Sequence, residues 1–164
     1  MVTEATADRL GSSRLSDLVP HAEQMTFGGP AECPERPLCL GGLEDVYGLR
    51  FSDFLPLDAG GPLTVQALAE GQVDVALLFS TSGRLATEGF RALDDDLNLQ
   101  PAENVVPVMA SDVEQRFGRD VARTLDAVSA SLTVRGLQVM NAGLDRGLTS
   151  ERLASSWLIA NSLD

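Results

Sequence analysis

The sequence predicts an α/β fold, and three observations support this prediction. Short apolar segments in the first half of the chain are each followed by a small-residue loop and then by a helical pattern. Three of these loops are rich in glycine, which suits a tight passage from a strand into a helix. From residue 111 onward only helical patterns occur. We therefore expect strands and helices in the first half and helices alone in the second.

The first third of the chain is expected to alternate helices with strands. Residues 13–23 carry apolar side chains at helical spacing, and residues 24–27 follow as a short strand that ends in a glycine pair. The segment 31–40 is expected to be a loop. Apolar residues mark the next helix over 43–47, and Gly48 is expected to end it.

The middle of the chain contains the two longest predicted strands. Residues 51–57 have apolar side chains on both faces. Residues 73–79 form the most apolar strand, as expected of a parallel strand that is buried on both faces. Between the two, Pro62 suits the first turn of a helix over 62–70, because its missing N–H would be unpaired there. Gly71 is expected to end that helix.

The expected elements become shorter and then purely helical. A helix over 83–87 precedes strands over 90–93 and 105–109, and the acidic loop 94–103 separates these strands. Ser111 is a candidate N-cap with Glu114 three residues later, the reciprocal capping arrangement. Thr149 and Arg152 mark the start of the last helix. Three or four helices fit the apolar stripes, which are Val121, Leu125 and Val128, then Leu132, Leu137, Met140 and Leu144, and finally Leu153, Trp157 and Leu158.

Composition limits the function classes. The chain has 164 residues with 12 basic and 24 acidic side chains, so its formal net charge is −12. Such a surface repels phosphate backbones and anionic lipid heads, which argues against nucleic acid or a membrane surface as partner. No apolar run approaches the roughly 20 residues needed to cross a bilayer, and the first residues lack the pattern of a signal peptide.

Two cysteines lie close together, at Cys33 and Cys39, in a segment stiffened by two prolines. This spacing can close a small disulfide, and the alternative is a pair of free thiols. Two thiols cannot complete a tetrahedral zinc site, and the single histidine, His21, lies in another segment. We expect a disulfide and no metal centre at these cysteines.

Three glycine-rich loops each follow the carboxyl end of a predicted strand, where open α/β sheets bind ligands. Glycine allows backbone N–H groups to approach a ligand, and a helix that starts after the loop favours a carboxylate. A small anionic or zwitterionic ligand would fit there, although such turns also serve merely as connections. The candidate ligand-binding residues in these loops are Gly29, Pro30, Asp58, Gly60, Ser80 and Thr81.

The sequence argues against an enzyme. It contains no Gly-x-Ser-x-Gly, Walker or Rossmann glycine pattern, and His21 stands alone in a predicted surface helix. A thiolate–imidazole pair of a cysteine with His21 is the weak alternative, which the proline-rich loop disfavours. The run Asp94-Asp95-Asp96 is a weak alternative for calcium, because it lacks the glycine and glutamate of an EF-hand loop. No catalytic residue and no cofactor are therefore expected.

Five segments occur in an order typical of one protein family. They are Glu32-Cys33-Pro34-Glu35-Arg36-Pro37, Gly42-Leu43-Glu44-Asp45-Val46-Tyr47-Gly48-Leu49, Pro56-Leu57-Asp58-Ala59-Gly60-Gly61-Pro62-Leu63-Thr64-Val65, Val73-Asp74-Val75-Ala76-Leu77-Leu78-Phe79-Ser80-Thr81 and Leu99-Gln100-Pro101-Ala102-Glu103-Asn104-Val105-Val106-Pro107-Val108. Together they resemble the glycine betaine, choline and carnitine binding proteins of osmoprotectant ABC importers, and the resemblance covers nearly the whole chain.

The resemblance implies a periplasmic-binding-protein-like (type II) fold with two α/β lobes, joined by crossing strands, around a ligand cleft. Residues 1–12 would be a crossover segment, 13–77 the second lobe, and 78–164 a mostly helical part that returns to the first lobe. The opening half-lobe of the family is expected to be missing. The chain would then expose the edge of a sheet, which is expected to promote self-association.

The resemblance also implies a binding role. The family holds quaternary ammonium groups in aromatic cages, and two cage positions align with Phe79 and Glu103, so this cage looks depleted. The ligand carboxylate is expected near the three loops and the cationic end near Phe79 and Glu103. The expected partners are a small zwitterionic or quaternary-ammonium solute and the importer's membrane permease subunits. The family works outside the cytoplasm, in the periplasm or as a cell-surface lipoprotein. The alternative is a truncated interaction module without a transport role, which associates with itself or with a partner protein.

Overall fold

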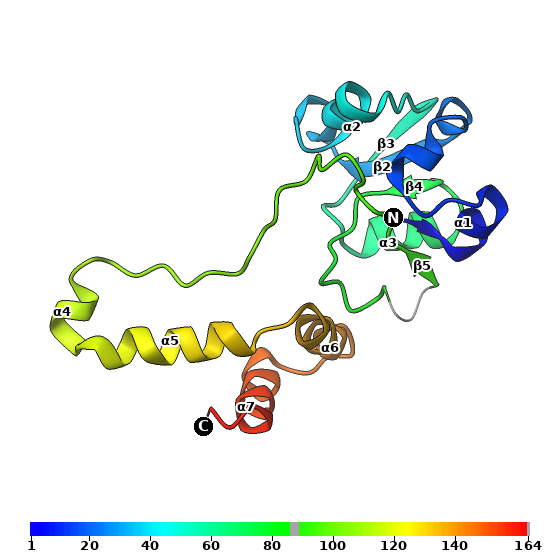
Figure 1. Cartoon of the computed structure of the whole chain (residues 1–164). Coiled ribbons are helices and arrows are strands. Elements are labelled where there is room, and N and C mark those ends of the chain that lie inside the picture. The colour runs from blue at the N-terminus through cyan, green and yellow to red at the C-terminus, as the bar shows by residue number, and fades with distance from the viewer. Residues whose placement is uncertain (86–88, 164) are drawn as a thin grey trace. The chain divides into compact units, whose positions relative to one another are not determined.

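The structure is a computed structural model and describes residues 1–85 and 89–163. The chain divides into two compact units, Met1–Pro101 and Ala102–Asp164, which we call the sheet unit and the helical unit (Figure 1). The boundary predicted between residues 77 and 78 is a different one, because it separates the two lobes that would enclose a ligand. It stays a prediction.

The core of the sheet unit is a three-stranded parallel sheet. Its strands are β2 (Thr26–Pro30), β3 (Asp53–Leu57) and β4 (Val75–Ala76), in the order β3-β2-β4. Both neighbours pair with β2 in parallel. The α/β prediction is therefore confirmed.

The side chains of this sheet alternate between two apolar clusters. Phe27, Phe54 and Val75 are aligned across the three strands and pack into one cluster. The residues one position further, Leu55 and Ala76, pack into the other. Since successive side chains of a strand point to opposite faces, the two clusters cover the two faces of the sheet.

Two helices cover these faces. α2 (Leu40–Tyr47) contributes Leu43 and Tyr47 to the cluster of Phe27, and α3 (Pro62–Ala69) contributes Val65 and Leu68 to the cluster of Ala76. α2 ends at Gly48, whose φ of 70° is left-handed, and α3 has Pro62 in its first turn, both as predicted.

The strand β2 differs from its prediction in position. It was expected over residues 24–27 with the glycine pair as a loop, but the pair lies inside the strand. A Cβ on Gly28 would lie 3.0 Å from side-chain atoms of both Leu57 and Val73, so the close packing on this face leaves room only for glycine. The glycines serve packing here rather than a turn.

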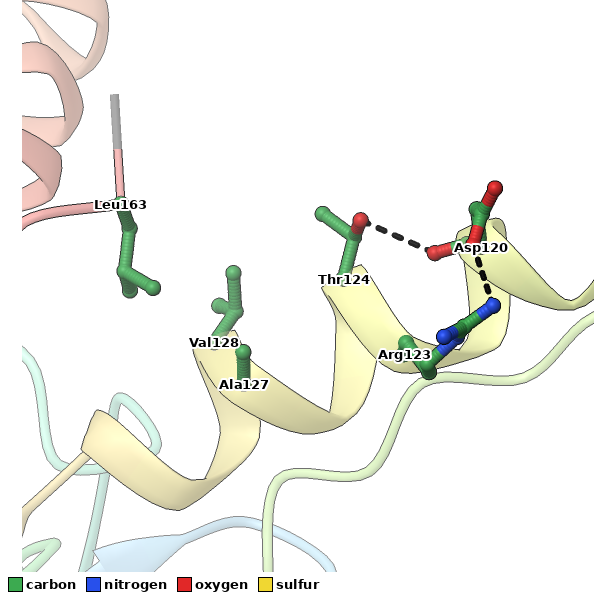
Figure 2. A pocket seen from close by; sticks show the side chains of 6 residues that line it. All are labelled: Asp120, Arg123, Thr124, Ala127, Val128 and Leu163. Atoms are coloured by element: carbon green, nitrogen blue, oxygen red, sulfur yellow. Dashed lines mark hydrogen bonds and ion pairs between the residues drawn. The ribbon is translucent and has the colours of Figure 1, made fainter.

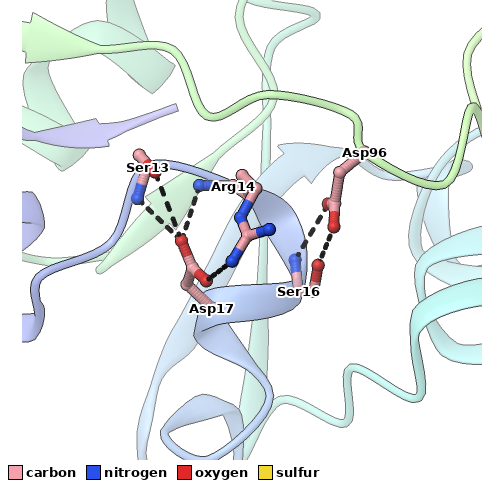
Figure 3. Close-up of polar contacts among 5 residues, drawn as sticks. All are labelled: Ser13, Arg14, Ser16, Asp17 and Asp96. Carbon is pink, nitrogen blue, oxygen red and sulfur yellow. Dashed lines mark hydrogen bonds and ion pairs between the residues drawn. The ribbon is translucent and has the colours of Figure 1, made fainter.

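The predicted helix over residues 13–23 is wrong, because the structure has two short 3₁₀ helices, η1 (Leu15–Leu18) and η2 (Ala22–Gln24). Pro20 lies between them and has no N–H to continue a helix. Asp17 also stabilises this non-helical course of the chain. Its carboxylate accepts the backbone N–H groups of Ser13 and Arg14, each at 2.9 Å (Figure 3). These bonds lower the pKa of Asp17 to about 2.

A second, two-stranded sheet pairs β1 (Val2–Thr3) with β5 (Phe90–Arg91) in antiparallel orientation. The helix α1 (Glu4–Leu10) follows β1 and was not predicted. Two local sequence signals mark this helix. The side chain of Thr3 caps it by accepting the N–H of Thr6, and Gly11 ends it at a φ of 63°.

The remaining strand predictions are only partly met. Of the predicted strand over 73–79, only Val75–Ala76 is paired, although the N–H of Leu77 still donates to Gly28 O at 2.9 Å. Of the predicted helix over Gly83–Thr87, Ala86 and Thr87 lie outside the described residues, and 83–85 form a turn. The predicted strand over 105–109 is wrong, because this segment has no regular structure and pairs with no described strand.

The acidic segment 94–100 is fastened to the sheet unit by its own carboxylates. Asp95 accepts hydrogen bonds from the hydroxyl of Tyr47 and from the N–H groups of Leu99 (2.9 Å) and Gln100 (2.6 Å). Asp96 accepts the hydroxyl and the N–H of Ser16 (Figure 3). The acidic run therefore holds a loop in place.

The described residues of the helical unit form four helices: α4 (Val113–Phe117), α5 (Arg119–Ser131), α6 (Val134–Asp145) and α7 (Ser150–Ala160). Thr149 caps α7 by accepting the N–H of Arg152, as predicted. The predicted Ser111 cap is wrong, because α4 starts after Asp112 without a side-chain cap. A turn closed by the N–H of Val113 and the C=O of Ala110 includes Ser111.

The helical unit has little core of its own. The predicted stripe of Val121, Leu125 and Val128 is only half-buried, and Gly143 is the one buried residue among those described in this unit. A Cβ on Gly143 would overlap the side chain of Leu153, so glycine is what lets α6 and α7 approach each other. No helix of the described residues is long and apolar enough to cross a membrane.

A first prediction concerns the bond between Tyr47 and Asp95. Tyr47 is buried, and Tyr47→Phe should lower the free energy of unfolding by about 1–3 kcal/mol, because it leaves Asp95 and the N–H of Leu97 without this partner. Burial and the bond to Asp95 raise the pKa of Tyr47 to about 12. The folded state therefore favours the neutral phenol, and this contribution should be present below pH 10 and lost as pH rises towards 12.

Urea unfolding followed by circular dichroism measures both effects. In a double-mutant cycle with Asp95→Asn, the two losses should be less than additive. Additive losses, or an unchanged alkaline profile in Tyr47→Phe, would show that the hydroxyl does not stabilise the loop.

Candidate ligand-binding edge of the sheet

The three predicted loops come together because all three strands of the main sheet run in the same direction. β2 ends at Pro30, β3 at Leu57 and β4 at Ala76, and Pro30 is in register with Leu57. The segments that follow these strands therefore begin at one edge, which we call the carboxyl edge. Ligands of open α/β sheets bind at this kind of edge.

Gly29 and Pro30 reach the carboxyl edge from inside β2. Both are buried and belong to the strand, whereas the sequence had placed them in a loop. A Cβ on Gly29 would lie 3.3 Å from the ring of Phe27 and 3.6 Å from the sulfur of Cys33. Their backbone is thus enclosed by protein, and the loop proper begins at Ala31.

Asp58 directly follows β3, and its carboxylate caps α3. It accepts the N–H of Leu63 at 3.1 Å, the N–H of Thr64 at 2.9 Å and the hydroxyl of Thr64 at 2.6 Å. Partial burial acts to raise the pKa of Asp58, but the hydrogen bonds, led by that of the Thr64 side chain, outweigh it and lower the pKa. The positive end of α3 is therefore already matched by a carboxylate of the protein itself.

Gly60 and Phe79 meet at the same edge, although 19 positions separate them. A Cβ on Gly60 would lie 3.0 Å from the Phe79 ring, and Gly60 has a left-handed φ of 70°. Glycine is therefore favoured at this position both by its backbone conformation and by the ring. Phe79 is 55% exposed, so the ring rests on the loop with much of its surface towards solvent.

Ser80 and Thr81 continue from Phe79 into a turn that the N–H of Ser82 closes by donating to the C=O of Phe79 at 3.0 Å. Ser80 is exposed and Thr81 is half-buried. The carboxyl edge therefore brings hydroxyl groups next to an exposed aromatic ring.

The cysteine loop borders this edge. Cys33 and Cys39 form a disulfide, and their Cα atoms are 5.2 Å apart. The N–H of Leu40, the first residue of α2, donates to the sulfur of Cys33 at 3.3 Å. Both cysteines are buried, so the bridge fastens the loop after β2 to the beginning of α2.

Glu103 belongs to the helical unit, where it is exposed, so its position opposite Phe79 stays a prediction.

Two surface hollows lie away from the candidate residues. One, of ≈ 480 Å³, runs along α5 towards Leu163, with Asp120 and Arg123 paired at 2.6 Å on its wall (Figure 2). The other, of ≈ 460 Å³, lies between β1 and the end of α3.

The alternatives for metal and for nucleophilic chemistry find no support in these contacts. The carboxylates of Asp95 and Asp96 bind Tyr47, Ser16 and backbone N–H groups, and no cluster of metal ligands occurs among the described residues. The cysteines are joined to each other, so neither offers a thiolate.

Comparison with known sequences identifies a family over nearly the whole chain. A family described as the substrate binding domain of ABC-type glycine betaine transport system matches residues 1–160. The glycine-betaine-binding protein of Pseudomonas aeruginosa is 33% identical over 94% of this chain and 53% of its own length. The glycine betaine-binding protein YehZ of Escherichia coli is 29% identical over 96% of this chain and 54% of its own. The chain thus spans about half the length of these relatives.

Solved structures resemble this fold closely. A crystal structure of a glycine betaine/carnitine/choline ABC transporter protein superposes with a TM-score of 0.84 at 24% identity, over 99% of this chain and 58% of that chain. The apo form of YehZ from Escherichia coli superposes with a TM-score of 0.69 at 27% identity, over 99% and 61%.

A second prediction follows from the Asp58 cap. Asp58→Ala should lower the free energy of unfolding by about 1–2 kcal/mol, because the N-terminus of α3 loses its acceptor. The folded-state pKa of Asp58 lies below its ordinary value, so its contribution is present above pH of about 4 and lost as pH falls through the folded pKa. The difference between the variant and the parent protein should therefore shrink in acid.

Asp45→Ala, at an exposed position of α2, is the matched control, and it should change the free energy of unfolding by less than about 0.5 kcal/mol. Equal effects of the two variants in urea unfolding would contradict the capping role.

Proposed function

This chain belongs to the family of substrate-binding domains of ABC-type glycine betaine transport systems, and from this membership we propose that it binds glycine betaine or a related zwitterionic solute for an osmoprotectant importer. The family consists of solute-binding domains and not of enzymes. The fold is that of part of a type II periplasmic-binding-protein-like protein. Because the chain spans about half of its relatives, solute, permease partner and transport role are all parts of the proposal.

The observation that carries the proposal is the exposed ring of Phe79 at the carboxyl edge. A quaternary ammonium group cannot donate a hydrogen bond, and it is attracted by the face of an aromatic ring. Phe79 rests on Gly60 and is followed by Ser80 and Thr81, whose hydroxyl groups suit a carboxylate. A solute with a cationic and an anionic end fits this pair of features.

The charges around the edge support one orientation of the solute. Asp58 has a lowered pKa and is ionised at neutral pH, which disfavours a second carboxylate beside it. We therefore propose that the carboxylate of the solute lies nearer Ser80 and Thr81, where Gly29 and Pro30 shape the floor. The cationic end would then lie over Phe79, with Glu103 on the opposite side of the cleft.

The disulfide supports a location outside the cytoplasm. Disulfides persist in oxidising compartments such as the periplasm or the cell surface, and Cys33 is bonded to Cys39. We propose that the chain works in such a compartment beside membrane permease subunits.

Calorimetry tests the proposed function directly. Glycine betaine, choline, carnitine and proline betaine would be titrated into the chain, with glycine as a control that lacks the methyl groups. The same series would be run on a fusion that adds to this chain the part of the Pseudomonas aeruginosa relative that the match leaves out. Binding of a methylated solute in preference to glycine by either form would support the proposal. No preference in both forms would contradict it.

A third prediction isolates the aromatic ring. Phe79→Leu keeps an apolar side chain but removes the ring face, so affinity for glycine betaine should fall about 2- to 30-fold, the equivalent of about 0.5–2 kcal/mol. Phe117→Leu, at an exposed ring of α4, should leave affinity unchanged. Equal losses in both variants would mean that Phe79 does not face the solute.

A fourth prediction concerns Glu103. A carboxylate attracts a quaternary ammonium group only by charge and loses that attraction in salt, whereas a ring keeps it. Glu103→Tyr in the fusion should therefore tighten glycine betaine binding and reduce its salt dependence. Unchanged or weaker binding at two salt concentrations would place Glu103 away from the solute.

A further inference from the structure

The turn over residues 58–61, which leads from β3 into α3, supports the ring of Phe79. A Cβ on Gly60 would lie 3.0 Å from Cδ2 and 3.3 Å from Cε2 of that ring. The same Cβ would lie 3.5 Å from the Cα of Leu78, which is buried. One side of the ring thus rests on the backbone of the turn. A change in the turn therefore either moves the ring or frees it.

Asp58 and Thr64 hold this turn together. The carboxylate of Asp58 accepts the N–H groups of Leu63 and Thr64, at 3.1 and 2.9 Å. The hydroxyl of Thr64 lies 2.6 Å from Oδ1 of Asp58 and 2.7 Å from its backbone carbonyl oxygen. The N–H of Gly60 donates to that carbonyl oxygen at 2.9 Å. A chain of hydrogen bonds therefore leads from Thr64 through Asp58 to the residue that supports the ring.

Thr64 is fully buried, so it cannot touch a solute itself. A buried hydroxyl is stable where it is hydrogen-bonded, and the two oxygens that accept from this one both belong to Asp58. A hydroxyl has a single hydrogen and donates to one of them at a time, and either bond fixes Asp58 to the first turn of α3. Because α3 packs into an apolar cluster through Val65 and Leu68, the turn is tied to a firmly packed helix.

We propose that Thr64 is a positioning residue of the solute site, whose hydroxyl holds the turn and so sets the orientation of the Phe79 ring. This inference rests on the proposed function, in which the cationic end of the solute lies over that ring. The attraction requires the cation to lie over the ring face, within about 6 Å of the ring centre. A ring fixed in one orientation meets this condition in every molecule, whereas an unsupported ring divides its time among staggered rotamers.

Nuclear magnetic resonance tests the orientation of the ring without any solute. The ring current of Phe79 should displace the signals of the Gly60 α protons, and Phe79→Leu supplies the undisplaced reference. Thr64→Val keeps the shape but removes the hydroxyl, so the ring should spread over three staggered χ1 positions and the displacement should fall to about a third. Thr64→Ser keeps the hydroxyl and should keep the displacement. Tyr47→Phe is the matched control, because it removes another buried hydroxyl that donates to a carboxylate, and it should change nothing at Gly60.

Two outcomes of this comparison would overturn the inference. One is a full displacement in folded Thr64→Val, or an equal fall in Tyr47→Phe. The other is the absence of any difference between the parent protein and Phe79→Leu, because the ring would then not rest on Gly60. Thr64→Ala removes the same hydroxyl without placing a methyl group against the carboxylate, and it replaces Thr64→Val if that variant does not fold.

Calorimetry with glycine betaine tests the consequence for binding, in the chain or in the fusion. Thr64→Val should weaken binding by no more than the loss of the ring does, about 2- to 30-fold. It should cause no further loss in the Phe79→Leu background, because the ring on which it acts is already gone. Equal losses in both backgrounds would overturn the inference. If neither form binds a methylated solute, the proposed function fails, and the resonance comparison still decides whether Thr64 orients the ring.

Discussion

The parallel pairing of β2 with both β3 and β4 determines where everything else in the sheet unit lies. Because β2 is bonded on both sides, its residues alternate between two apolar clusters, and each cluster needs its own helix. The glycine at position 28 follows from the same constraint, since Leu57 and Val73 leave no room for a side chain. Parallel direction also brings the ends of all three strands to one edge, so segments far apart in sequence begin side by side.

Several acidic side chains of the sheet unit accept hydrogen bonds that stabilise its loops and helix ends, so they are already engaged within the protein. Asp58 caps α3, Asp95 binds Tyr47 and two N–H groups, and Asp17 holds the turn that leads into η1. In each case a carboxylate accepts N–H groups that a helix or turn leaves without a partner. A net charge of −12 therefore overstates how much acidic surface is available to bind cations.

The sequence indicated the sheet and the two covering helices, with the end of α2 and the start of α3, because apolar spacing, Gly48 and Pro62 act locally. It misplaced what depends on distant contacts. Whether Gly28 and Gly29 form a turn or a strand depends on Leu57, Val73 and Leu77, which pack against them in the fold. The local sequence pattern does not show that these residues are neighbours. The role of Asp58 could have been inferred, since an acidic residue shortly before a proline-initiated helix with a threonine in its first turn is a capping signal. The hydrogen bond between Tyr47 and Asp95 joins residues 48 positions apart, and no local sequence signal predicts it.

The sheet unit and the helical unit differ in their cores and in their charge. The sheet unit has a buried core on both faces of its sheet and most of the acidic charge, whereas the helical unit is nearly neutral and has almost no core. At an ionic strength of 0.1 M, charges on a protein surface act over only about 10 Å. Added salt therefore weakens the attraction of the acidic unit for the cationic end of a solute. The attraction of the Phe79 ring persists in salt, so a salt titration separates the contribution of the acidic side chains to solute binding from that of the ring.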